Sequence, residues 1–285
     1  MKKILIFGNS SMVGKRIYDS LQDKYYIKTV GRNGEADINF DIKNLHYNLE
    51  TDEQFDVVIN CIASFEKDDT VGAINNEIVN SLGAMLVGIL AHKVKCKHVL
   101  YLSSIFTYDN PENGYYGSYG ISKRHGQENT GLICEKLGMG YTTLLCAQLY
   151  DEYGKARQHQ PLFYSIIDNA KEGKDITFYG KRDPQRNFVF VEDLVKVIEQ
   201  VIDHQIFGIF PCVHPISNSL VQIAETAFRV FGKGGKVKFL PERQDIPTVY
   251  IPENQELYKL IDSPHFTELE TGITLIRNQL LSKEI

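Results

Sequence analysis

Short runs of β-branched and apolar residues alternate with helical patterns along the first half of this 285-residue chain, and this alternation restricts the fold more than any other feature. Apolar strands separated by helices are typical of a parallel sheet that is covered on both faces. The sequence therefore predicts an α/β fold, a Rossmann-type doubly wound parallel sheet with a smaller C-terminal α/β substrate lobe. The expected central strands are 4–7, 27–30, 57–62, 99–103 and 142–147.

The segments between these strands have apolar residues at helical spacing. Val13, Ile17 and Leu21 recur every four residues, which predicts a helix that packs one face on the sheet. Segments 78–93 and 118–137 are also predicted to be helices.

The character of the chain changes at about Tyr150, where loops become longer and proline becomes more frequent. We expect residues 1–149, together with about 188–205, to form a dinucleotide-binding Rossmann domain. Residues 150–187 and 206–285 are expected to form the substrate-binding lobe.

The charge of the chain argues against nucleic acid and anionic membranes as partners. The 31 basic and 36 acidic residues give a net charge of −5, so the sequence offers no general basic field. No stretch approaches the ~20 apolar residues of a membrane span, and we expect a soluble, cytoplasmic protein. The five cysteines are odd in number and scattered, so we expect reduced core residues. No metal site is expected, because the cluster of His92, Cys96 and His98 has no paired partner motif.

The segment GNSSMVG at 8–14 directly follows the first strand and opens the first helix. A helix N-terminus presents unpaired amides and a partial positive charge to a pyrophosphate. The first and last glycines suit a tight turn and close packing of the helix, whereas Ser11 stands where a third glycine is common. A dinucleotide site is predicted, with an ordinary structural turn as the alternative. Its expected contacts are Gly8, Ser10, Ser11, Met12, Val13 and Gly14.

The second strand is followed by Arg32, in the region where an acidic residue commonly receives the ribose hydroxyls of NAD. An arginine there can bind a 2′-phosphate, which favours NADP(H) over NAD(H) as the cofactor. The alternative is a solvent-facing arginine. Asp41 and Ile42, after the next short strand, are expected to contact the edge and the apolar face of the adenine.

Tyr119 and Lys123 are four residues apart in the predicted helix 118–137, and Ser104 ends a strand upstream. Residues at this spacing lie on one helix face, so the ammonium is expected to lower the pKa of the phenol from about 10. A hydroxyl, a phenol and an ammonium together suit proton transfer to or from a sugar-like hydroxyl. A solvated helix face is the alternative.

These motifs together resemble the extended short-chain dehydrogenase/reductase family of nucleotide-sugar epimerases, dehydratases and reductases. The resemblance implies that Tyr119 exchanges a proton with the reacting oxygen, that Ser104 hydrogen-bonds this oxygen, and that Lys123 tunes the phenol and contacts the nicotinamide ribose. The resemblance is carried by the turn 8–14, NCIA at 60–63, Val79-Asn80 with Gly83, Ser103-Ser104 with Tyr108, YGISK at 119–123 with Glu128, and RNFVFVEDL from Arg186.

The resemblance also implies further binding residues and a homodimer that packs the helices 78–93 and 118–137 of two subunits. Arg186 is expected to bind the diphosphate of a nucleotide-sugar substrate, with a surface ion pair to Asp183 or Glu192 as the alternative. Lys181 and Arg182 are nearby candidates for the same role. Further cofactor contacts are expected from Cys61, Ile62, Ala63 and Asn80, and further substrate contacts from Ser104, Phe106 and Gln148, although Gln148 stands where relatives often have asparagine.

The two residues after Ser104 bear on the choice of reaction. Relatives that eliminate water, decarboxylate or invert carbons next to a ketone place an acid, a base or a thiol there. Ile105 and Phe106 carry no transferable proton, which leaves hydride transfer alone. We expect NADPH-dependent reduction of a keto group, at C4, on a nucleotide-linked deoxy sugar. The alternatives are an NAD-dependent C4 epimerase and a non-catalytic NADP(H)-binding sensor.

Overall fold

The computed structural model describes residues 1–112, 114–253, 256–262 and 265–282. Its centre is a seven-stranded sheet with the order β11-β6-β5-β4-β1-β2-β3, and all pairs in it are parallel. The predicted doubly wound sheet is confirmed, and the strand order reverses between β1 and β4. The strands are β1 (Lys3–Phe7), β2 (Tyr26–Gly31), β3 (Ile38–Asn39), β4 (Val57–Asn60), β5 (His98–Ser104), β6 (Gly140–Cys146) and β11 (Gly208–Cys212).

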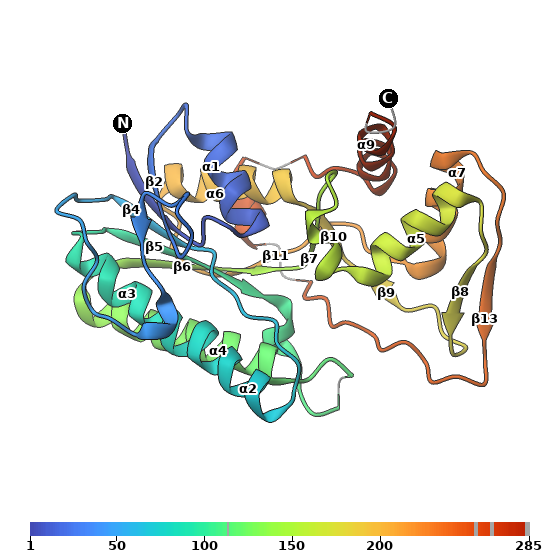
Figure 1. Ribbon diagram of the computed structural model, residues 1–285, viewed down its shortest axis with the longest axis horizontal. Coiled ribbons are helices and arrows are strands. Elements are labelled where there is room, and N and C mark those ends of the chain that lie inside the picture. The colour runs from blue at the N-terminus through green and yellow to red at the C-terminus, as the bar shows by residue number, and fades with distance from the viewer. Residues whose placement is uncertain (113, 254–255, 263–264, 283–285) are drawn as a thin grey trace.

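Helices cover both faces of this sheet (Figure 1). Helices α1 (Met12–Leu21) and α6 (Val191–His204) pack on one face, and their apolar side chains join one buried cluster. Helices α3 (Gly83–Lys93) and α4 (Ser118–Leu137) lie on the other face. A single turn of π-helix, η2 (Glu77–Leu82), joins α3 to α2 (Thr70–Asn76).

Close packing of α4 against η2 depends on a glycine. A Cβ atom on Gly126 would lie 1.9 Å from the carbonyl oxygen of Asn80, whereas one on Gly88 of α3 would meet its nearest neighbour at 3.4 Å. Gly126→Ala is therefore expected to lower the free energy of unfolding by about 1–3 kcal/mol through overpacking. Gly88→Ala, the matched control, is expected to raise it by up to about 1 kcal/mol, because alanine favours the helix. Urea unfolding measures both, and equal effects of the two changes would contradict the packing argument.

The expectation that no stretch approaches the length of a membrane span is wrong for the helical stretch Thr70–Lys93. It is long and apolar enough to cross a membrane, with a mean hydropathy of 1.3 over its best window, of which 56% is buried here. The buried polar residues Asn76 and Asn80 bond to Ser118 and Ser122 of α4. A core helix of a soluble protein has the same length and composition, so this stretch is weak evidence for a membrane span.

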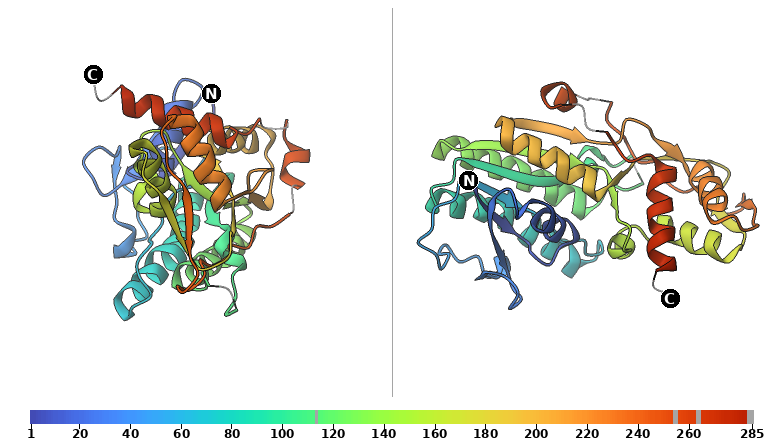
Figure 2. Two further views of the ribbon diagram at one scale, coloured as in Figure 1. Left: turned by 90° about the vertical axis from the view of Figure 1, so that its right-hand side faces the viewer. Right: turned by 90° about the horizontal axis from the view of Figure 1, so that it is seen from above.

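The smaller lobe lies at one end of the large sheet (Figures 1 and 2). Its core is a separate cluster of aromatic and aliphatic residues from α5, α7 and α9 with the strands beside them. Its elements are β7 (Gln148–Tyr150), η4 (Lys155–Gln158), α5 (Pro161–Glu172), β8 (Ile176–Tyr179), β9 (Gln185–Arg186), β10 (Phe188–Phe190), β12 (Asn218–Ser219), α7 (Leu220–Phe231), β13 (Val237–Leu240) and α9 (Leu269–Leu281).

The expected boundary at residue 206 is wrong in one respect. Residues 208–212 form β11, which pairs with β6 and completes the large sheet. Val249, and Leu257 of α8 (Glu256–Leu260), are buried in the same cluster as α1 and α6. The chain thus returns twice to the large sheet after it first enters the smaller lobe.

Candidate active site

A cavity of about 920 Å³ lies at the carboxyl ends of the central strands, between the large sheet and the smaller lobe. Ligands of open parallel α/β sheets bind at this position, beside the point where the strand order reverses. The structure brings most of the predicted site residues together here. Those that line the cavity are Ser10, Ser11, Met12, Val13, Cys61, Ala63, Ser104, Phe106, Tyr119, Lys123, Gln148 and Arg186.

Ser104, Tyr119 and Lys123 converge because a strand end and a helix start meet in the cavity. β5 ends at Ser104, and the first two turns of α4 carry Tyr119 and Lys123. Gly120 permits the close approach of α4, since a Cβ atom there would lie 2.5 Å from the carbonyl oxygen of Phe106. The three groups needed for proton transfer therefore face one space.

The pKa of Tyr119 is raised above its ordinary value, contrary to the prediction. Burial is the largest cause, because it disfavours the phenolate, and a hydrogen bond with Ser104 acts in the opposite direction. Phe65 adds to the burial, because its ring stacks on the Tyr119 ring with centroids 3.8 Å apart. Tyr119 therefore keeps its proton at neutral pH, as a proton donor must.

Lys123 is buried, and its ammonium points to the strand ends. It donates hydrogen bonds to the carbonyl oxygens of Leu102 at 2.9 Å and Ile62 at 3.3 Å. Burial lowers the pKa of Lys123 to about 8, so the ammonium is mostly charged at pH 7. These two bonds hold the ammonium against backbone oxygens and not against the phenol. The pKa of Tyr119 is therefore set mainly by the burial of Tyr119, and not by Lys123.

The turn between β1 and α1 is tight and closely packed. Gly8 has a φ of +100°, a conformation that favours glycine. A Cβ atom on Gly14 would lie 2.3 Å from the carbonyl oxygen of Gly8. Ser11 has an ordinary φ of −71°, and its hydroxyl accepts from the Gly14 amide at 2.9 Å, so it caps α1 without needing to be glycine. The N-terminus of α1 thus borders the cavity, where it suits a pyrophosphate.

Two residues predicted to contact the cofactor have supporting positions instead. Asn80 is fully buried, donates to Ser64 O and Ser122 Oγ, and accepts from the Ser64 amide. The side chain of Ile62 packs on the core of the large sheet. Asn80 therefore fixes the loop after β4, and that loop presents Ala63 to the cavity.

Arg32 and Asp41 line a second cavity of about 560 Å³ beyond β2 and β3. Arg32 is exposed, and its guanidinium has no partner among the residues that the structure describes. Asp41 caps the turn η1 (Ile42–Asn44) by accepting from the Lys43 amide at 3.0 Å. Ile42 is buried, and a Cβ atom on Gly83 would lie 2.8 Å from it. Its expected contact with adenine is corrected, because its side chain belongs to the core.

Arg186 is buried, so the alternative of a surface ion pair is wrong. Its guanidinium donates to Gln185 O at 2.8 Å, to the Tyr115 hydroxyl at 3.0 Å and to Pro247 O at 2.8 Å. None of the described carboxylates pairs with it, and burial lowers its pKa. A buried cation without a counter-charge is costly, and an anionic ligand in the cavity would offset that cost.

The lining of the cavity is cationic, although the whole chain has a net charge of −5. No carboxylate occurs among its described lining residues. Lys181 and Arg182, the alternatives to Arg186, lie outside it, and their amides donate to Asp245. A local field of this sign suits a ligand with phosphate groups. The cationic lining residues are Lys15, Lys123, Lys155 and Arg186.

Gln148 contributes a neutral polar group. Its Nε2 donates to Gln160 Oε1 at 3.0 Å. Its own Oε1 is buried, and within the described part of the chain it has no hydrogen-bond partner. Buried acceptors are normally paired, so a ligand hydroxyl at this position would satisfy it.

Loop residues that the sequence analysis missed complete the cavity. The His159 ring lies 4.8 Å from that of Phe65, and the Tyr115 ring lies 5.5 Å from that of Phe106. Phe65, His159 and Tyr115 lie outside helices and strands, so no periodicity marks them. For Phe65 the sequence offered one signal: it lies two residues after Ala63, which was already expected to contact the cofactor.

Residues 4–209 match the model of a family described as the NAD dependent epimerase/dehydratase family. Among curated proteins, UDP-glucuronic acid decarboxylase 1 of Xenopus tropicalis is 24% identical over 302 residues, which cover 95% of this chain and 70% of that protein.

Solved structures share the fold at low identity. UDP-glucose 4-epimerase of Thermotoga maritima, with UDP-glucose, has a TM-score of 0.77 and 16% identity, covering 99% of this chain and 100% of that one. dTDP-4-dehydrorhamnose reductase of Bacillus anthracis, in complex with NADP, has a TM-score of 0.73 and 18% identity, covering 98% of each chain.

Proposed function

Since the chain belongs to the NAD-dependent epimerase/dehydratase family, which processes nucleotide sugars, we propose that it reduces a keto group at C4 of a nucleotide-linked deoxy sugar, with NADPH as the reductant. One observation carries this proposal. A single cavity joins Ser104, Tyr119 and Lys123 to a lining that has cations and, among its described residues, no carboxylate. That arrangement suits a diphosphate-bearing substrate beside a proton donor.

The residues of the chain divide the work as follows. The turn 8–14 and the N-terminus of α1 would hold the dinucleotide, and its reduced nicotinamide would supply a hydride to the carbonyl carbon. The carbonyl oxygen then carries the developing negative charge, and Tyr119 transfers its phenolic proton to it. Ser104 donates a hydrogen bond to the same oxygen, and the Lys123 ammonium places a positive charge in the same cavity.

The turn after Ser104 supports simple hydride transfer. Ile105 is buried, and Phe106 lines the cavity in η3 (Ile105–Tyr108). Neither side chain can remove or deliver a proton, as elimination of water or loss of a carboxyl group would require. A C4 epimerase is the second candidate, because Ser104 and Tyr119 also serve reversible hydride transfer. Such an enzyme would retain its NAD.

The wall around Tyr119 favours a deoxy sugar. Phe65 and Phe106 line the cavity, and the centroids of their rings lie 3.8 and 6.3 Å from that of the Tyr119 ring. Such a wall suits a methyl group, whereas a sugar carboxylate placed against these rings would lose part of its hydration.

The free guanidinium of Arg32 supports NADP(H). It is exposed in the second cavity and is not engaged by any described residue, so a 2′-phosphate would be its first partner. Arg32→Gln is therefore the variant that should remove a preference for NADPH over NADH.

A turnover assay separates the candidates. The purified chain is incubated with NADPH and a 4-keto-6-deoxy nucleotide sugar, and the reduced nicotinamide absorbance is followed. Stoichiometric loss of absorbance is the expected result. A copurifying NAD that does not exchange, with interconversion of C4 epimers, would instead identify the epimerase. Binding of NADPH without any turnover would identify the sensor.

We also propose a homodimer formed through α3 and α4 with their neighbouring turns. Leu82 of η2 and Leu132 of α4 are 40% and 52% exposed, although both are large apolar residues. Burial of such residues between two copies is favourable. Analytical ultracentrifugation measures the oligomeric state, and a sedimenting species of twice the mass of the chain is the expected result.

A further inference from the structure

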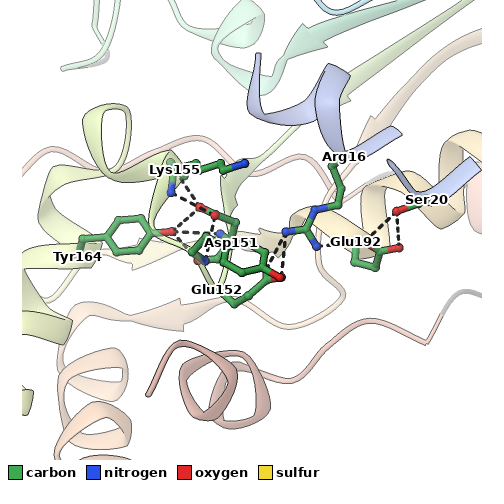
Figure 3. A network of polar contacts seen from close by, with 9 residues as sticks. Arg16, Ser20, Asp151, Glu152, Lys155, Tyr164 and Glu192 are labelled. Carbon is green, nitrogen blue, oxygen red and sulfur yellow. Dashed lines mark hydrogen bonds and ion pairs between the residues drawn. The ribbon is translucent and has the colours of Figure 1, made fainter. Parts of the chain in front are cut away.

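Arg16 connects the cofactor turn to the smaller lobe through an ion network (Figure 3). It lies on α1, two residues after Gly14. Its Nη2 donates to both carboxylate oxygens of Glu152, at 3.0 and 2.9 Å, and its Nη1 donates to Glu192 at 3.3 Å. Ser20, one turn further along α1, also donates to Glu192. One cation thus joins α1, the start of α6 and the loop after β7.

The loop that Arg16 reaches, residues 151–159, contributes to the cavity. The buried Asp151 organises its first turn by accepting from the amides of Tyr153, Lys155 and Ala156 and from the Tyr164 hydroxyl. The members of this loop that line the cavity are Lys155, Ala156, Gln158 and His159, all exposed except Ala156. The loop therefore supplies one of the four cations of the cavity from a largely exposed segment.

Arg16 fixes the loop against α1 through its ion pair with Glu152 and its position over the Tyr153 ring. Other contacts tie the loop to different elements, since Arg157 pairs with Asp168 of α5 and His159 packs on Phe65. The side chains of Arg16 and Glu152 are 17% and 15% exposed, so solvent screens their interaction only in part. Without the arginine, the carboxylates of Glu152 and Glu192 would face each other uncompensated, and like charges repel. Loss of Arg16 should therefore move the loop away from α1.

We propose that Arg16 is a positioning residue that couples the two halves of the cavity. A dinucleotide bound at the N-terminus of α1 orders this helix start, and Arg16 then holds the loop 151–159 where Lys155 and His159 meet the second ligand. Whichever ligand binds first supplies the ordering of the loop, so the other binds more tightly. This inference rests on the proposed function, because it requires two nucleotide ligands.

The test measures binding, not turnover. The dissociation constant of UDP, and separately of dTDP, is determined by calorimetry on the full chain without and with saturating NADPH. The ratio of the two constants is the coupling. In the unmodified chain, saturating NADPH should lower the dissociation constant of the nucleotide that binds by about fivefold or more. Arg16→Gln and Glu152→Gln should each reduce this ratio of dissociation constants to less than about two. The double variant should have the same ratio as the single variants.

Arg229→Gln is the control, because Arg229 also bonds to a glutamate, Glu270 at 2.7 Å, between α7 and α9 and outside the cavity; the two side chains of this pair are more exposed, at 58% and 57%. It should leave the coupling unchanged. A coupling near one in the unmodified chain, or full coupling in Glu152→Gln, would overturn the inference. Glu152→Gln decides the matter if Arg16→Gln fails to fold. If neither NADPH nor either nucleotide binds the unmodified chain, the proposed function itself fails.

Discussion

Tyr119→Phe should lower the turnover number by about 10²- to 10⁴-fold, the range typical of a lost general acid. The phenol shares a hydrogen bond with Ser104, and burial raises its pKa so that it keeps its proton at neutral pH. The change removes one oxygen and leaves the stacking on Phe65 in place. Steady-state oxidation of NADPH with the 4-keto nucleotide sugar measures the loss, and the dissociation constant of NADPH should stay within about threefold.

Tyr141→Phe controls for the removal of a phenolic hydroxyl elsewhere. Its hydroxyl donates to Gln127 O at 3.0 Å, and it does not line the cavity. This variant should retain turnover close to that of the unmodified chain. If Tyr119→Phe also retained it, the catalytic role of the phenol would be refuted. If the unmodified chain had no turnover while both variants bound NADPH equally, the sensor reading would be supported.

Arg186→Gln should weaken binding of the nucleotide sugar by about 10- to 100-fold, as expected for the loss of one charge-assisted hydrogen bond worth roughly 1.5–3 kcal/mol. Arg186 is a buried cation of the cavity, and its guanidinium makes no carboxylate pair among the described residues, so an anionic group gains from it. The Michaelis constant of the substrate and the dissociation constant of UDP or dTDP report the change.

Arg182→Gln is the matched control, because Arg182 is four residues away and its side chain is 77% exposed beside Asp245. It should change these constants by less than about threefold. Arg186 also bonds to Tyr115 and Pro247, so a thermal melt of each variant must show that it is folded at the assay temperature. Equal effects of the two substitutions would refute a specific role for Arg186.

The parts of the fold with strong local signals could be predicted. Apolar strands and the 3.6-residue period of α1 located the large sheet, because burial on both faces imposes those patterns. β11 was missed because it contains Pro211, which normally argues against a strand. It pairs with β6 alone, as an edge strand, and there the missing amide costs little.

The site was predictable where a motif fixes spacing within one element, as for Tyr119 and Lys123. It was not predictable where loops meet in space, as for Phe65 and His159. The protonation of Tyr119 was also wrongly predicted, because Lys123 bonds to Leu102 O and Ile62 O, and sequence spacing does not show which way an ammonium points. Asn80 and Ile42 were expected to contact the cofactor, but their side chains are buried in the core. Sequence spacing does not show the direction of these side chains either.

The two returns of the chain to the large sheet, through β11 and through the segment around Val249 and Leu257, have a mechanical consequence. Several separate connections therefore run between the large sheet and the smaller lobe, and no single one of them can act as the hinge. Wide opening would have to bend all of them together, so ligands should enter through small local shifts of side chains and loops. For the same reason, neither half can be cut out as one contiguous piece, and we expect both halves to melt in a single transition.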